Sequence, residues 1–316
     1  MRIAIVGAGF VGGATGRGFL KHKHQVVFID ASEEKVNALR GGGLEAYLPE
    51  QYDKITTDIT MVSVPTPTKN NKFQFKFLGS AIADFGLRLK THNKYHTLVI
   101  RSTVPPGTTR QLVIPLVERA SGKKVGKDFG IVMQPEYLRQ ATANEDFERP
   151  WFVLIGEYDR KSGIAIDKLY RSFDVPIQHC TLEEAEMQKY VHNVFNAVKI
   201  AFFNEMRMAF KHFGWDDEKI FLAVAESCEG IWNPIYGMRD LGAFDGACLP
   251  KDTQALLEWG ERHGFNFGIL KSVITENTRH GLLLASSKKM TADSNEKMSV
   301  GPMKSIKVDY LANIKT

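Results

Sequence analysis

Short apolar runs alternate with polar or glycine-rich segments along residues 1–180. The run RIAIV is followed by a small-residue helical pattern, VGGATGRGFLKHK, and by a second apolar run, QVVFID. Further strand patterns lie in the segments 58–68, 96–113, 129–138, 151–156 and 175–180. This alternation predicts an α/β fold with a Rossmann-type, doubly wound, mostly parallel sheet that binds ligands at the carboxyl ends of its strands. The loops PTPT, STVPPGT and QPEYLRQ are therefore candidate walls of a site.

The hydrophobic period changes near Leu182, where apolar residues begin to recur at helical spacing without proline. This pattern predicts one long helix over 182–213 that stops at Gly214. Shorter helices are predicted within 216–230, 254–264 and 266–286, and the sequence after Ser286 is polar and lysine-rich. We therefore expect a Rossmann domain over 1–181, a helical central domain over 182–286 and a polar tail over 287–316.

The first strand, turn and helix contain the glycine pattern G-x-G-x-x-G at Gly7, Gly9 and Gly12. The first glycine permits a tight turn, the second lets the backbone approach a diphosphate, and the third lets the helix pack close to the strand. Asp30 ends the second strand, where a carboxylate accepts the ribose hydroxyls of a dinucleotide and repels a 2′-phosphate. The pattern predicts NAD as the cofactor rather than NADP.

Bulk composition excludes several classes of protein. The net charge is +5, and hydrophobic residues make up 43% of the 316 positions. The apolar runs are too short to span a bilayer and no signal-peptide pattern is present, so we expect a cytoplasmic protein with no membrane partner. The basic residues lack interleaved aromatics, which argues against a nucleic-acid partner. Three cysteines and scattered histidines predict neither a disulfide scaffold nor a metal site.

One cysteine has an unusual setting, GACLPKDTQAL at 246–256. Small residues precede Cys248, and Lys251 and Asp252 follow it within one helical turn. A lone cysteine in an unknown context is more often a small core residue than a nucleophile. A nucleophilic thiolate, however, would be favoured by a nearby cation such as Lys251 or Lys189. Cys180 and Cys228 are taken as structural.

Six segments, in this order, resemble the UDP-glucose/GDP-mannose dehydrogenase family. They are GAGFVG at 7–12, SVPTPT at 63–68, STVPPGTT at 102–109, QPEYLRQ at 134–140, AEMQKYVHNVFNAVKIAFFNE at 185–205 and GACLPKDTQAL at 246–256. The resemblance covers residues 1 to about 285. It implies oxidation of the C6 alcohol of a nucleotide sugar, such as UDP-glucose, to a uronic acid by two hydride transfers to NAD⁺.

The resemblance also implies roles for individual residues. Cys248 would attack the C6 aldehyde, giving a thiohemiacetal and then a thioester that is hydrolysed. Lys189 and Asn193, one turn apart on the long helix, would steady the oxyanion. Asp252 would move protons, acting through Thr103, and Glu136 would supply a second carboxylate near the sugar.

Two larger sets of contacts follow from the same resemblance. The residues expected to bind cofactor are Gly7, Gly9, Phe10, Val11, Gly12, Asp30, Lys35, Thr66, Thr103, Gln140 and Lys251. The residues expected to contact the nucleotide sugar are Glu136, Tyr137, Leu138, Arg139, Lys189, Asn193, Tyr236, Gly237 and Leu241. The long helix carries more apolar positions than one core face needs, which predicts a homodimer through 182–213.

The sequence departs from the family pattern at three points. Gln140 replaces the usual glutamate, so an acid–base role at that position passes to Glu136 or Asp252. Asp245 replaces a glycine near the cysteine, and the chain has no segment for the further α/β domain that family members carry. Two alternatives therefore stay open: a hydroxyacid dehydrogenase that makes a single hydride transfer with Lys189 and Asn193, and an NAD-binding, oligomer-forming relative with impaired turnover.

Overall fold

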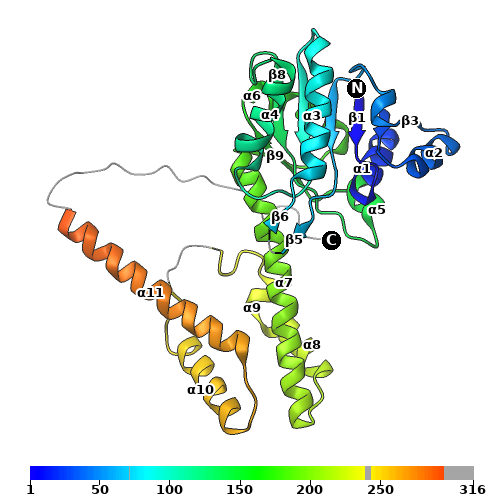
Figure 1. Ribbon diagram of the computed structural model, residues 1–316. Helices are drawn as coiled ribbons and strands as arrows, with labels where there is room; N and C mark the ends of the chain where they lie inside the picture. Colours follow the sequence, from blue (N-terminus) through cyan, green and yellow to red (C-terminus); the bar gives the residue numbers. More distant parts are fainter. Residues whose placement is uncertain (71, 239–242, 295–316) are drawn as a thin grey trace. The chain divides into compact units, whose positions relative to one another are not determined.

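The computed structural model describes residues 1–70, 72–238 and 243–294, with side chains given up to residue 286 (Figure 1). The chain separates into two compact units, Met1–Phe195 and Asn196–Thr316. The boundary falls inside one continuous helix, α7 (Leu182–Phe213), and each unit is described by itself below. The expected boundary at 181/182 remains a prediction about domain organisation.

The first unit is built on an eight-stranded sheet in the order β10-β9-β8-β7-β4-β1-β2-β3. Every neighbouring pair is parallel except β8 and β9, which confirms the predicted doubly wound, mostly parallel fold. A separate hairpin pairs β5 (Thr68–Lys69) with β6 (Lys72–Phe73). The bounds of the large sheet are β1 Arg2–Val6, β2 Gln25–Ile29, β3 Glu45–Tyr47, β4 Ile59–Val62, β7 His96–Ile100, β8 Phe129–Met133, β9 Val153–Glu157 and β10 Ile177–Cys180.

Helices cover both faces of this sheet. One buried cluster includes Phe19 of α1 and Ile166 of α6, and the other includes Ile82 of α3 and Val117 of α4. The central strands between them are mostly apolar, as expected of strands that are buried on both faces. The helices of this unit are α1 Phe10–Lys21, α2 Glu33–Gly41, α3 Lys76–Thr91, α4 Ile114–Ser121, α5 Ala143–Glu148 and α6 Arg160–Tyr170, with short turns at Pro49–Gln51, Thr109–Val113 and Arg171–Phe173.

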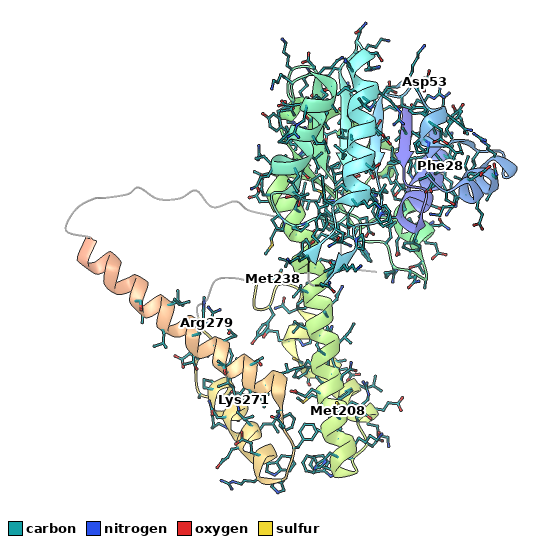
Figure 2. All side chains as sticks on the ribbon, viewed as in Figure 1. Phe28, Asp53, Met208, Met238, Lys271 and Arg279 are labelled. Atoms are coloured by element: carbon teal, nitrogen blue, oxygen red, sulfur yellow. The ribbon has the colours of Figure 1, made fainter. Side chains whose placement is uncertain are left out.

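Glycines set how closely α1 lies on the sheet. A Cβ added at Gly16 would lie 2.3 Å from the ring of Phe28, and one at Gly18 would lie 2.0 Å from the ring of Phe147. Phe28, labelled in Figure 2, is a fully buried residue of β2. The glycines on this face of α1 therefore leave room for large aromatic rings from the sheet and from α5.

The second unit is helical. After the second part of α7 come α8 (Glu218–Ser227), α9 (Glu229–Trp232), α10 (Leu249–Arg262) and α11 (Gly268–Ser294). Stacked rings of Phe213, Trp215 and Trp259 join the end of α7 to α10. The predicted helix over 182–213 is confirmed, whereas α11 continues to Ser294, into the segment expected to be tail. The rest of that tail, 295–316, lies outside the described residues.

No helix in the described part of the chain is long and apolar enough to cross a membrane.

His96, the first residue of β7, gives a testable dependence of stability on pH. It is 1% exposed, and burial lowers its pKa to about 3, with its Nε2 lying 2.9 Å from Thr60 Oγ1. Below the unfolded pKa of about 6.5 the unfolded chain binds a proton that folded His96 does not, so stability falls with decreasing pH. We expect His96→Asn to reduce this slope between pH 6.5 and 5 by up to about 1.4 kcal/mol per pH unit, measured by urea unfolding. Parallel pH profiles for the two proteins would contradict this assignment.

Candidate functional site

The glycine-rich turn between β1 and α1 forms one wall of a cleft. Gly7 has a positive φ of +90°, and a Cβ added at Gly12 would lie 1.8 Å from the carbonyl oxygen of Gly7. At Gly9, which caps α1, an added Cβ would meet nothing within 4 Å. The turn thus needs glycine at two positions to close, while the third leaves open space where a diphosphate can approach the start of the helix.

Asp30, just after β2, is fixed by backbone amides. Its Oδ2 accepts from the N–H of Ala8 at 2.7 Å, and its Oδ1 accepts from the N–H of Ser32 at 2.9 Å. The ammonium of Lys35 lies 3.7 Å from Oδ2. Each carboxylate oxygen keeps a further lone pair, so Asp30 can accept ribose hydroxyls as the sequence predicts.

Two adjoining cavities fit a dinucleotide along this wall. One, of about 290 Å³, is lined by Gly7, Gly9, Phe10, Val11, Asp30, Lys35, Ser63, Val64, Pro65, Thr66, Arg101, Ser102, Thr103 and Glu136. The second, of about 400 Å³, shares Gly7, Asp30 and Lys35 with the first and extends to Phe77 and Arg88 of α3. Eight of the eleven residues expected to bind cofactor, among them Phe10, Lys35, Thr66 and Thr103, therefore line one continuous cleft, while Gly12 lies buried beneath it.

The opposite wall consists of loops that follow β4, β7 and β8. The hydroxyl of Thr66 donates to the carbonyl of Thr103 at 2.7 Å, and the hydroxyl of Ser102 donates to the carbonyl of Val64 at 2.7 Å. These bonds join the PTPT and STVPPGT loops side by side. Glu136, from the loop after β8, completes this wall.

Lys189 of α7 is a buried cation that meets this wall. Its side chain is 7% exposed, its ammonium donates to the backbone carbonyl of Glu136, and it lies 3.3 Å from Glu136 Oε1. The other carboxylate oxygen of Glu136 accepts from the N–H of Leu138 at 2.7 Å. A buried ammonium needs such a partner because desolvation of an unpaired charge costs several kcal/mol. The structure therefore brings two predicted catalytic residues into direct contact.

Aromatic residues surround this ion pair. The ring of Tyr137 lies 5.4 Å from the Lys189 ammonium, and its hydroxyl donates to Gln188 Oε1 at 2.6 Å. Burial raises the pKa of Tyr137 well above its usual range, so it stays a neutral phenol. Burial also lowers the pKa of His192, with the charge of Lys189 acting in the same direction. Asn193 is exposed on α7, one turn from Lys189.

Arg139 and Gln140, at the end of the QPEYLRQ loop, do not line the cleft. The guanidinium of Arg139 binds Asp146 at 2.6 Å, and its backbone N–H donates to the same carboxylate at 2.8 Å. This pairing holds the pKa of the Asp146 carboxyl well below its usual range. Gln140 is exposed and lines neither cavity. Arg139 thus shapes the QPEYLRQ loop, and its charge is already paired.

The remaining predicted residues belong to the second unit. Cys248 is exposed at the N-terminal end of α10, and Asp252 N–H donates to its carbonyl at 2.8 Å. Lys251 and Asp252 pair with each other at 2.5 Å on the exposed side of the helix. Tyr236 and Gly237 line a cavity of about 1040 Å³ in this unit, and Leu241 lies outside the described residues.

Sequence reasoning missed the side chains that hold these loops. Glu186 of α7 binds the amides of Gly107 and Thr109. In the second unit the Asn277 side chain accepts from Phe244 N–H at 2.7 Å and donates to Phe244 carbonyl at 2.9 Å, just before the Cys248 segment. A polar residue inside a helical pattern gives no local signal of its distant partner, and this is why both escaped notice.

Two family models match the chain. The NAD binding domain of the UDP-glucose/GDP-mannose dehydrogenase family matches residues 1–174, and the central domain of the same family matches residues 183–279. The chain belongs to this family. NAD is accordingly its cofactor, in agreement with the glycine turn, Asp30 and the adjoining cavities.

Individual relatives agree with this membership. GDP-mannose 6-dehydrogenase of Pseudomonas syringae pv. tomato is 36% identical over 299 residues, covering 88% of this chain and 68% of the relative. UDP-glucose 6-dehydrogenase TuaD of Bacillus subtilis is 32% identical, covering 88% and 63%. Among solved structures, a ternary complex of GDP-mannose dehydrogenase from Pseudomonas aeruginosa has a TM-score of 0.83 at 32% identity, covering 89% of this chain and 69% of that one.

A pair of glycine variants tests the cofactor cleft. Gly9→Ala adds a methyl group to open space at a φ of −71°, so we expect the thermal midpoint to change little while NAD⁺ affinity falls at least tenfold, because the methyl group occupies the place of the diphosphate. Gly12→Ala forces backbone apart and should lower the thermal midpoint itself. Circular dichroism melts and calorimetric NAD⁺ titrations measure both. Undiminished NAD⁺ binding by Gly9→Ala would remove the cleft assignment.

Proposed function

We propose that this protein oxidises the C6 alcohol of a nucleotide sugar to the carboxylate in two NAD⁺-dependent steps. The observation that carries the proposal is the exposed thiol of Cys248 at the N-terminal end of α10, with Lys251 and Asp252 in the next turn. The N–H groups and dipole of a helix start stabilise negative charge, so this position suits a sulfur nucleophile. Family membership supports the same reaction class.

The chemistry balances with two NAD⁺ and one water for each sugar oxidised. Bound NAD⁺ accepts a hydride from C6 in each oxidation. In the first, the hydroxyl on C6 also gives its proton to a base, which leaves an aldehyde. The Cys248 thiol then adds to this aldehyde, with its proton passing to the carbonyl oxygen, and gives a thiohemiacetal. Loss of the second hydride gives a thioester, and water cleaves it to the uronic acid and the free thiol. Covalent capture divides one difficult oxidation into easier steps.

Lys189 and Asn193 are proposed to hold the oxygen on C6. The ammonium of Lys189 is desolvated and has its place fixed by Glu136 and Tyr137. Preorganised donors of this kind stabilise a developing oxyanion more strongly than water does. Glu136 is proposed as the second carboxylate near the sugar, and Asp252 as the group that moves protons during hydrolysis.

The names of the relatives decide which nucleotide sugars should be tested first. Relatives named GDP-mannose 6-dehydrogenase and UDP-glucose 6-dehydrogenase are both more than 30% identical to this chain. The first five relatives all carry the former name, so GDP-mannose heads the panel to be tested and UDP-glucose follows it. Cytoplasmic localisation remains part of the proposal on the sequence pattern alone.

The second candidate is a dehydrogenase that makes a single hydride transfer to or from a hydroxyacid. It is favoured by the pair Lys189 and Asn193, which needs no thiol partner. A 3-hydroxyisobutyrate dehydrogenase from Mycobacterium tuberculosis shares the fold with a TM-score of 0.56 at 15% identity. The third candidate is an NAD-binding relative with impaired turnover. Neither the second nor the third candidate needs the thiol of Cys248, whereas the nucleotide-sugar 6-dehydrogenase does.

Cys248→Ala tests the mechanism. The unmodified protein should form two NADH for each sugar oxidised, and the variant should lose the acid product, with turnover lowered by at least about a thousandfold. Coupled absorbance at 340 nm and chromatography of the acid measure both quantities. One NADH per sugar, with unchanged product from Cys248→Ala, would instead favour the single-transfer dehydrogenase.

Cys228→Ala is the matched control, because Cys228 is the other exposed thiol. Burial raises the pKa of Cys180 to about 11, so that thiol should resist alkylation at neutral pH. Iodoacetamide should therefore abolish turnover equally in the unmodified protein and in Cys228→Ala. NAD⁺ affinity should be the same in all three proteins.

A homodimer through α7 is the proposed assembly. The helix exposes many apolar side chains; Met208, labelled in Figure 2, is 64% exposed. Its exposed large apolar residues are Met187, Val191, Val194, Phe195, Val198, Ile200, Phe202 and Met208. Contiguous apolar surface of this extent is rare on monomers. Val198→Glu should shift the mass measured by light scattering from dimer to monomer at micromolar concentration, whereas Lys199→Glu should not. A monomeric unmodified protein would remove this proposal.

A further inference from the structure

A second buried carboxylate lies on α7, one helical turn before Lys189. Glu186 is 0% exposed; its Oε2 accepts from the N–H of Gly107 at 2.5 Å and its Oε1 accepts from the N–H of Thr109 at 2.7 Å. Burial raises the pKa of this carboxyl, while the two amide bonds act in the opposite direction. A carboxylate that is buried and bonded to two amides of another segment stabilises the arrangement of that segment, because leaving either group unpaired in the interior would cost free energy.

Both amides belong to the segment that carries Thr103. Gly107 has a φ of +88°, and Thr109 begins the short turn Thr109–Val113 that leads into α4. N–H groups at the start of a helical segment lack partners within it, and a carboxylate supplies them with charge-assisted bonds. The opposite end of this segment is held where Thr66 donates to the carbonyl of Thr103. The loop is therefore fixed at both ends.

We infer that Glu186 is a positioning residue that sets the Thr103 loop against the turn of α7 carrying Lys189. It does so by joining the two elements directly, through Gly107 and Thr109. This inference deepens the proposed function, on whose assignment of Thr103 and Lys189 it rests. Without Glu186, the cleft would keep the glycine-rich turn between β1 and α1 but would lose the alignment of the opposite wall, which contains the Thr103 loop.

The order of the strands says which half of the cofactor should be affected. Asp30 follows β2, on one side of β1, and marks the adenosine half of the cleft. Thr103 follows β7, on the other side of β1, and so lies on the nicotinamide half. The Glu186 contacts touch only the second side. Displacement of the loop should therefore lower the affinity for the whole dinucleotide and leave the affinity for an adenosine fragment unchanged.

Glu186→Gln in the full chain tests this directly. The amide keeps the shape of the side chain but can accept only one of the two N–H groups, because its NH₂ faces the other. We expect the Kd for NAD⁺ to rise about fivefold to tenfold, the equivalent of one displaced hydrogen bond, with the Kd for AMP within twofold. Where the unmodified protein turns over a nucleotide sugar, kcat should fall by about tenfold or more.

Glu183→Gln is the matched control. It removes the same charge one turn earlier on α7, where Glu183 pairs with exposed Arg110 at 2.6 Å. We expect its Kd values and its thermal midpoint to match those of the unmodified protein. Equal weakening of NAD⁺ and AMP binding by Glu186→Gln, or no weakening of either, would overturn the inference.

Amide hydrogen exchange keeps the inference testable even where Glu186→Gln folds poorly. In the unmodified protein the N–H groups of Gly107 and Thr109 should exchange as slowly as those of the central strands. Exchange at the rate of a free loop would overturn the positioning role. Neither the binding measurements nor the hydrogen exchange requires a sugar substrate. If the unmodified protein is inactive but Glu186→Gln weakens the binding of NAD⁺ and not of AMP, the proposed function is contradicted and the role of Glu186 is supported.

Discussion

The burial of a positive charge at Lys189 is the constraint on which the candidate site depends. An ammonium removed from water must have a counter-charge and acceptors close by, and Glu136 supplies a carboxylate oxygen and a backbone carbonyl. That requirement places the loop after β8 against the first turns of α7. Because α7 begins directly after the edge strand β10, its first turns connect the edge of the sheet to Glu136, which lines the cofactor cleft.

The same region shows a repeated arrangement in which carboxylates bind backbone amides, either within their own loop or on another element. Asp30 binds Ala8 and Ser32, Glu136 binds Leu138, and Glu186 binds Gly107 and Thr109. Loops at the carboxyl ends of parallel strands present many N–H groups without partners in the sheet. Buried carboxylates satisfy them and at the same time restrict the loops to one arrangement. Rigid walls of this kind allow a cofactor to bind without first paying to order them.

The sequence was informative wherever the physical cause was local. Alternating apolar runs located seven of the eight strands of the large sheet, and the uninterrupted helical period from Leu182 located α7 with its observed ends. The three-residue strand β3 and the short β5–β6 hairpin lack a period long enough to detect. The antiparallel β9 is indistinguishable from a parallel strand in composition. Likewise, nothing next to Arg139 indicates that Asp146 on the following helix takes its guanidinium.

The two substitutions relative to the family pattern, Gln140 and Asp245, lie in different surroundings. Gln140 is exposed and outside both cavities, so the missing carboxylate there removes nothing from the contact between Glu136 and Lys189. Asp245 is different, because it lines the large cavity of the second unit together with Glu276 and His280. Two carboxylates beside one imidazole disfavour an anionic group at that wall and favour a hydroxyl or a cation. The Asp245 substitution therefore makes this wall of the cavity more acidic, whereas the Gln140 substitution leaves the contact between Glu136 and Lys189 intact.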